Sequence, residues 1–235
     1  MATFTVTDGQ DPFLHVSLQR GESVFAESDA MVMMDDTLDL SGNVQGGFLS
    51  GLARRLVADE SLFTQKVVAT RGPGDLLLSQ VVPGGLHVFD VGTQQYMLSD
   101  GAFLAAETSV EIKVRSQGLG GALFGASGGF FIMQTSGTGK LCVGGFGSLF
   151  LLTIQPGQNP VIDNGHVVAW DSRLSYDMVM GTSRQGGLLS NLVSSQTSGE
   201  GLVMKFSGSG QVLVCSRKRA GFAAWLRQQL GNARN

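Results

Sequence analysis

Residues 31–40 have the sequence MVMMDDTLDL, and the same pattern returns as FLAAETSVEI at residues 103–112 and VVAWDSRLSY at residues 167–176. Each copy has four apolar residues, an acid, two mostly polar residues, an aliphatic residue, a polar residue and a last apolar residue. The three copies align without a gap. Repetition of this kind predicts three diverged copies of one structural unit.

Two glycine landmarks follow each copy in the same order. The first is a glycine pair, and the second is a G-x-G element: Gly46-Gly47, Gly120-Gly121 and Gly186-Gly187; then Gly72-Pro73-Gly74, Gly137-Thr138-Gly139 and Gly208-Ser209-Gly210. Short apolar or β-branched runs lie on both sides of each G-x-G element, where glycine supplies the positive φ that a tight hairpin needs. The pattern predicts an all-β fold of short strands.

The repeat divides the chain into units of about 1–92, 93–157 and 158–220, within one compact body that spans residues 1–235. A unit of four to seven short strands could barely bury its own apolar face. We therefore expect neighbouring units to share sheet edges and a continuous core.

Two segments depart from the β pattern. Leu49, Leu52 and Leu56 have helical spacing and predict a short helix within residues 47–60. A C-terminal helix at about 221–231 is predicted more strongly, because four apolar residues share one stripe: Phe222, Trp225, Leu226 and Leu230.

Basic residues surround the C-terminal helix, in the run Arg217-Lys218-Arg219 and at Arg227 and Arg234. We expect the apolar stripe to dock onto the sheet while the charges stay in water. The alternative is contact with a protein partner or with an anionic membrane surface.

The composition is poor in charge and rich in glycine. Charged residues make up 15% of the 235 residues, 34 are glycine, and the formal net charge is −3. A typical soluble domain has about 25% charged residues. The deficit suggests that other subunits cover part of the surface, and the negative charge argues against a chain-wide nucleic-acid footprint.

The remaining composition favours a cytoplasmic protein. Cys142 and Cys215 are too few for a disulfide framework and are expected to be buried or half-buried thiols in a reducing compartment. The N-terminus lacks the features of a secretory signal, and apolar runs such as residues 149–154 are far too short to span a bilayer.

Several motifs resemble functional sites but lack required residues. Residues 136–140 (SGTGK) lack the first glycine and the final Ser or Thr of a phosphate-binding loop, and residues 118–123 (GLGGAL) lack the third glycine of a dinucleotide fingerprint. Asp35, Asp36 and Asp39 lack the register of a calcium loop.

The histidines His15, His87 and His166 have no metal-ligand spacing. We therefore expect no catalytic residue, cofactor or metal site, and no enzyme activity.

The acids Asp35, Glu107 and Asp171 occupy one position of the repeat, which predicts a structural role. Either they shape a bend between strands, or their carboxylates accept hydrogen bonds from loop N–H groups.

The chain resembles the altered inheritance of mitochondria family over residues 15–217. Residues 198–212 (SGEGLVMKFSGSGQV) resemble the closing motif of that family, and residues 163–170 (DNGHVVAW) and 60–63 (ESLF) also match. Ser209 stands where the family often has proline.

The resemblance implies a fold like that of the tryptophan RNA-binding attenuation protein, whose small sandwich-like β units, similar to a double-stranded β-helix, assemble into rings. A chain of three such units would be a pre-fused trimer of units. Three chains would then form a homotrimeric ring of nine units.

These observations favour a non-enzymatic oligomeric scaffold or interaction protein. The alternative is a ring-shaped protein that binds a small ligand or RNA. RNA is disfavoured because Lys66, Lys113 and Lys205 do not occupy matching positions along the sequence repeat.

Overall fold

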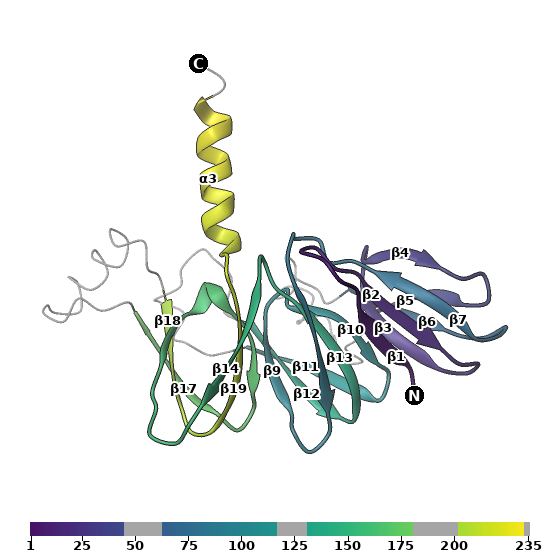
Figure 1. The fold of residues 1–235 in the computed structure, drawn as a ribbon, viewed down its shortest axis with the longest axis horizontal. Helices are drawn as coiled ribbons and strands as arrows, with labels where there is room; N and C mark the ends of the chain where they lie inside the picture. The colour runs from purple at the N-terminus through teal and green to yellow at the C-terminus, as the bar shows by residue number, and fades with distance from the viewer. Residues whose placement is uncertain (45–62, 117–130, 181–201, 233–235) are drawn as a thin grey trace, which may run out of the picture.

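The computed structural model describes residues 1–44, 63–116, 131–180 and 202–232. These residues form an almost entirely β body from which one C-terminal helix projects (Figure 1). The predicted all-β fold with a C-terminal helix is therefore confirmed. The predicted helix at 47–60 and the three glycine pairs lie outside the described residues.

The body contains short strands, as the spacing of glycine predicts. They are β1 (Thr3–Val6), β2 (Leu14–Leu18), β3 (Ser23–Glu27), β4 (Met31–Met34), β5 (Asp39–Val44), β6 (Phe63–Val68), β7 (Gly74–Leu78), β8 (Leu86–Val91), β9 (Tyr96–Ser99), β10 (Phe103–Glu107), β11 (Val110–Ser116), β12 (Phe131–Gly137), β13 (Gly139–Gly144), β14 (Leu149–Ile154), β15 (Val161–Asp163), β16 (Val167–Asp171), β17 (Ser175–Met180), β18 (Leu202–Ser207) and β19 (Gly210–Cys215). A 3-10 turn, η1 (Asn164–His166), lies between β15 and β16.

The strand pairing follows one scheme three times. The triplets β2-β7-β4, β8-β13-β10 and β14-β19-β16 have the same order, and so do β5-β6-β3, β11-β12-β9 and β17-β18-β15. A register shift also recurs within the third strand of each group: between Met31 and Met33, Phe103 and Ala105, and Val167 and Ala169. Each group of six strands, β2–β7, β8–β13 and β14–β19, is thus built alike, and β1 adds to the edge of β2.

The predicted unit boundaries near 92 and 157 stay predictions. β8 and β14 lie just before these boundaries in the sequence, but each pairs with a strand that comes after the boundary, β8 with β13 and β14 with β19.

Neighbouring groups are joined by antiparallel pairing of one strand from each. β3 pairs with β10, and β9 pairs with β16. Each junction joins two triplets into a six-stranded sheet, so the body has two six-stranded sheets between a four-stranded and a three-stranded one.

Three apolar cores lie between these four sheets. The first includes Leu14 and Leu76, the second Leu98 and Leu141, and the third Trp170, with further residues in each. The strands at the junctions lie between two cores, and all five residues of β10 and of β16 are buried. This explains why their sequences are nearly continuous apolar runs, whereas β2 alternates buried and half-buried residues.

The G-x-G turns differ between groups. Gly137, Gly139 and Gly208 have positive φ, as predicted. Gly74 does not, so that prediction is wrong for the first group. Glycine is needed there for close approach, because a Cβ at Gly74 would lie 2.5 Å from the Thr37 hydroxyl oxygen.

The helix α3 (Arg219–Asn232) begins after β19 and extends away from the sheets (Figure 1). Its predicted position, 221–231, agrees within two residues at each end. Among the described residues, no helix is long and apolar enough to cross a membrane.

Candidate interaction site at the C-terminal helix

The acids that recur in the sequence pattern accept hydrogen bonds in the turns of the β body. The Asp35 carboxylate accepts from the backbone N–H of Asp75 at 2.8 Å, and the Glu107 carboxylate accepts from that of Lys140 at 2.7 Å. Both donors follow the last glycine of a G-x-G element. The predicted role as an acceptor for loop N–H groups is confirmed for these two acids, and Asp171 fills it as well through the turn N–H of Arg173.

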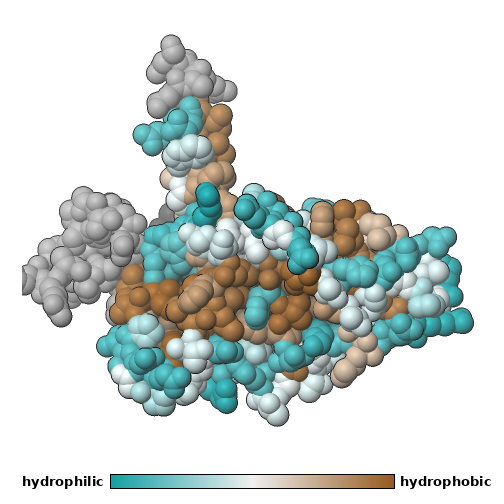
Figure 2. All heavy atoms as spheres, in the orientation of Figure 1, coloured by the Kyte–Doolittle hydropathy of each residue, from teal (hydrophilic) through white to brown (hydrophobic). Residues whose placement is uncertain are grey.

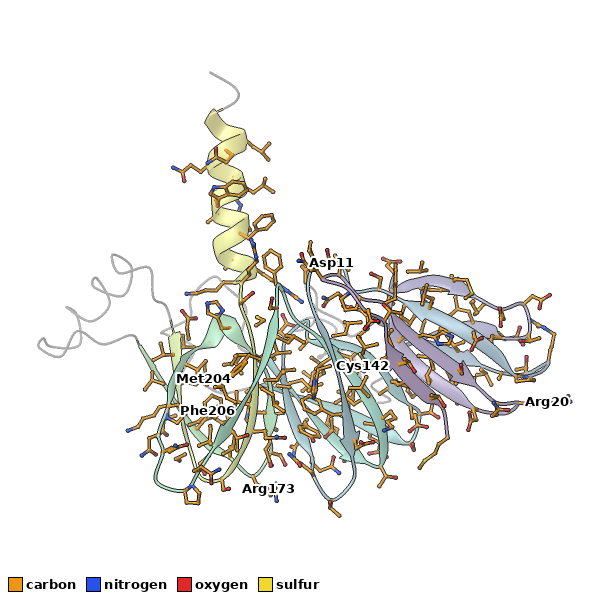
Figure 3. All side chains as sticks on the ribbon, viewed as in Figure 1. Asp11, Arg20, Cys142, Arg173, Met204 and Phe206 are labelled. Carbon is orange, nitrogen blue, oxygen red and sulfur yellow. The ribbon has the colours of Figure 1, made fainter. Side chains whose placement is uncertain are left out.

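The third acid, Asp171, has a different set of partners. Its fully buried carboxylate accepts from the Arg173 backbone N–H at 2.9 Å, from the Arg173 guanidinium at 2.5 Å, and from the Gln94 amide at 3.1 Å. Burial opposes ionisation, but the hydrogen bonds and the charge of Arg173 hold the pKa of Asp171 below its ordinary value. Arg173 itself is exposed and lies at the edge of the body away from α3 (Figure 3).

The segment that resembles a phosphate-binding loop is the hairpin between β12 and β13. The Lys140 ammonium forms an ion pair with Asp90 at 2.5 Å. Among the described residues, no group of three or more His, Cys, Asp or Glu side chains is placed to hold a metal ion.

Both cysteines are free and buried, as predicted, and Cys142 lies in the interior of the body (Figure 3). Burial raises the pKa of both thiols, so neither is a ready nucleophile.

The base of α3 is fixed to the β body by several contacts. The Arg217 backbone N–H donates to the Phe146 carbonyl at 3.1 Å, and the Arg219 guanidinium donates to the Gly101 carbonyl at 2.6 Å. The Lys218 ammonium forms an ion pair with Asp163. The start of the helix is therefore anchored on the second and third groups of strands.

Beyond its base, the helix is not packed against the sheets. Trp225 is 54% exposed and Leu230 is 62% exposed, and Phe222 and Leu226 are also exposed. The expectation that this stripe docks onto the sheet is therefore wrong. The Phe222 ring contacts Phe146 of the body edge to face, with centroids 5.2 Å apart. Figure 2 shows the apolar side of the helix as a brown strip above the body.

A cleft of about 480 Å³ lies where α3 meets the body, and its wall combines aromatic and basic side chains. The lining includes Phe146, His166, Arg217, Lys218, Phe222 and Trp225. Sequence reasoning found the helix and the basic run but missed Phe146 and His166, because these residues precede the helix by more than fifty positions and no local pattern marks them.

The three lysines that bear on RNA binding match more closely in the strand register than along the sequence. Lys66 in the first group and Lys205 in the third group occupy equivalent positions. In the second group this position is held by Gln134, and Lys113 lies opposite Gln134 on the neighbouring strand. The expectation that they do not match is therefore wrong in part. Acids accompany two of them: Asp177 is paired opposite Lys205, and Glu111 lies 3.8 Å from Lys113.

Comparison with known proteins gives consistent matches over nearly the whole chain. The family model for mitochondrial biogenesis AIM24 matches residues 4–217. An uncharacterized protein of Streptococcus pyogenes serotype M6 is 34% identical over 232 residues, which cover 96% of this chain and 90% of the relative. A crystal structure of a Streptococcus pyogenes protein from a structural genomics consortium is similar with a TM-score of 0.79 and 33% identity, and covers 97% of this chain and 100% of that one.

Replacement of Arg173 by alanine should destabilise the protein at pH 7, because Asp171 keeps a buried charge without its cation. The folded-state pKa of Asp171 should then rise, so protonation favours the folded variant at low pH. The loss should therefore shrink when urea unfolding is repeated near pH 4.5.

The matched control is Lys140→Ala, whose partner Asp90 is largely exposed. Its cost should stay below about 1 kcal/mol at both pH values. Equal losses for the two variants, or a loss in Arg173→Ala that does not change with pH, would contradict the assigned role of the buried carboxylate.

Proposed function

The chain belongs to the mitochondrial biogenesis AIM24 family, and from this premise we propose that it is a non-enzymatic, self-associating scaffold that docks on an anionic membrane surface through α3. The observation that carries the proposal is the apolar face of α3, held away from the body by an anchored base.

The chemistry of α3 suits an anionic lipid surface. Within the helix, Arg219 and Arg227 are cations and no residue is acidic, and Arg217 and Lys218 precede it. The exposed Trp225 is a side chain that favours the boundary between headgroups and hydrocarbon, and the exposed Phe222 adds apolar surface beside it. Cations beside exposed aromatic and aliphatic residues suit a contact with the headgroups of anionic lipids.

The length of α3 supports a surface contact. Its 14 residues would extend about 21 Å at 1.5 Å per residue, which is less than the roughly 30 Å of a bilayer core. The helix can place its apolar side in the interface without crossing it. The proposal places the protein in the cytoplasm, on the inner face of a membrane.

Self-association is the second part of the proposal. The resemblance to the ring-forming tryptophan RNA-binding attenuation protein favours a homotrimer of nine β units. The low charged fraction, 15%, is consistent with surface that is covered by other copies.

A second candidate function is the binding of a small ligand, and the cleft at the base of α3 favours it. Phe146 and Trp225 offer aromatic surface there, and Arg217 offers a cation. An anionic ligand with an apolar part would match this lining. No feature of the described residues favours RNA to the same degree, so nucleic acid is not proposed as a partner.

Sedimentation with vesicles tests the membrane contact. The protein should bind vesicles of phosphatidylcholine mixed with phosphatidylserine, and added salt should weaken the binding because exposed charges are screened. Trp225→Ser should lower the affinity about tenfold, since about 1.4 kcal/mol of apolar burial is lost.

The control for this variant is Phe150→Ser, since Phe150 is a 65% exposed aromatic residue on β14 rather than on the helix. It should bind like the parent protein. The proposal is refuted if the parent protein ignores anionic vesicles, or if both variants lose binding equally.

Native mass spectrometry of freshly purified protein tests self-association and separates the two candidate functions. The expected result is a mass of three chains with no added small molecule. A monomer at micromolar concentration would contradict the scaffold, and a stoichiometric small-molecule adduct would favour the ligand-binding alternative.

A further inference from the structure

Two strand pairs join the three groups, and both use the same strands of the repeat. The second strand of one group pairs with the third strand of the next: β3 with β10, and β9 with β16. At the ends of the array, the same two kinds of strand have a partner on one side alone among the described residues. β4 is an edge of the four-stranded sheet, and β15 is an edge of the three-stranded sheet.

The exposed residues of β4 occupy positions that are buried in the other groups. Met31, Val32 and Met33 are 41%, 52% and 42% exposed. Their counterparts at the internal junctions have exposed fractions of 4% or less: Phe103, Leu104 and Ala105 in β10, and Val167, Val168 and Ala169 in β16. Within the part of the chain that the structure describes, β4 is thus a junction strand without the neighbouring group that covers β10 and β16.

The opposite edge has the same character. Val161 in β15 is 59% exposed, whereas its counterparts Phe25 and Met97 are partly buried against the cores of the following groups. The correspondence rests on register, since Phe25, Met97 and Val161 pair with Lys66, Gln134 and Lys205 at one position of the repeat. The two open edges lie toward opposite ends of the long axis, β4 at the right of Figure 1 and the β17 and β18 sheet at the left.

The internal junctions define the register for a pair between β15 and β4. Ala26 lies opposite Ala105 at the first junction, and Leu98 lies opposite Ala169 at the second. Ile162 is the equivalent of Ala26 and Leu98 in the third group. Met33 is the equivalent of Ala105 and Ala169 in the first group, so Ile162 and Met33 would be partners. In the same way, Phe25 lies opposite Ala106 and Met97 lies opposite Trp170. Val161 is the equivalent of Phe25 and Met97, and Met34 is the equivalent of Ala106 and Trp170, so Val161 and Met34 would be partners.

The faces of these pairs agree with the cores. Ala26 and Ala105 both face the first core, and Leu98 and Ala169 both face the second. Ile162 packs against the third core, so Met33 of another chain would complete that core.

A proline next to this edge does not obstruct pairing. The Pro160 carbonyl accepts from the Phe206 backbone N–H at 3.0 Å, so the backbone groups of Pro160 point toward β18. Because these directions alternate along a strand, the N–H and C=O of Val161 point outward to the free edge. On β4, the Asp35 N–H donates to Asp75 in β7, so the groups of Met34 point outward. Both edges offer matching donors and acceptors.

We propose that β15 of one chain pairs antiparallel with β4 of a second copy, in the register Met33 opposite Ile162 and Met34 opposite Val161. The contact is head to tail and continues the stacking of groups from chain to chain. It rests on the self-association in the proposed function and specifies the surface that produces it. Repetition of a head-to-tail contact closes into a ring when the rotation between copies allows it.

Disulfide trapping of Met33→Cys with Ile162→Cys tests the register. This pair lies at a non-hydrogen-bonded position, where Cα atoms of paired strands are about 4.5 Å apart and a disulfide fits. After mild oxidation, the double variant should run as covalent dimers and trimers on a non-reducing gel and return to monomer on reduction. Each single variant should stay monomeric.

The matched positive control is Ala26→Cys with Ala105→Cys, the equivalent pair inside one chain, which should form an intramolecular disulfide. As a second readout, Met33→Lys should reduce the sedimenting mass to that of a monomer, because a charge would enter the third core of the neighbouring chain. Phe150→Lys, at an exposed position on β14, a strand that takes no part in the proposed junction, should leave the mass unchanged.

The possible failures can be told apart. Oligomers in sedimentation without covalent products from the double variant, and without an effect of Met33→Lys, would overturn this junction and leave self-association intact. A parent protein that sediments only as a monomer would overturn self-association, and the junction with it.

Discussion

The pairing of a strand from one group with a strand from the next is the interaction on which the rest of this structure depends. A single group has two small sheets and cannot cover both faces of its third strand. At the internal junctions the neighbour supplies the missing cover, so that Leu104 and Ala105 enter the core of the group before them. Since backbone N–H and C=O groups at a sheet edge need partners, each junction satisfies hydrogen bonding and apolar burial together. Within one chain, no described strand meets the same requirement at the outer edges of β4 and β15.

Much of this arrangement could be predicted from particular residues. The acid that follows four apolar residues marks the third strand of each group, and its carboxylate accepts a hydrogen bond from a turn N–H in all three groups. The position of α3 also followed from sequence, because Phe222, Trp225 and Leu226 have helical spacing. The contacts of α3 could not be predicted from the sequence. The spacing of apolar residues is the same whether a helix packs against its own sheet or against another molecule.

Other features needed coordinates because they depend on distant strands. Phe146 and His166 join the helix base only through the fold. The similarity of Lys66 and Lys205 is visible only in the strand register, since insertions shift them along the sequence. The exposure of Met31 and Val32 acquires meaning only beside their buried counterparts in β10 and β16. The two proposals reinforce each other, because in a closed ring every copy of α3 points to the same side. Several weak contacts with one surface then act together.

Hydrogen exchange of the backbone amides in β4 tests most directly whether a neighbouring chain completes the array. Under conditions where the protein is assembled, the segment 31–36 should exchange as slowly as the equivalent segment 167–172, because the Met34 amide would be bonded as the Trp170 amide is at the junction with Met97. Fast exchange of segment 31–36 beside slow exchange of segment 167–172 would contradict the account.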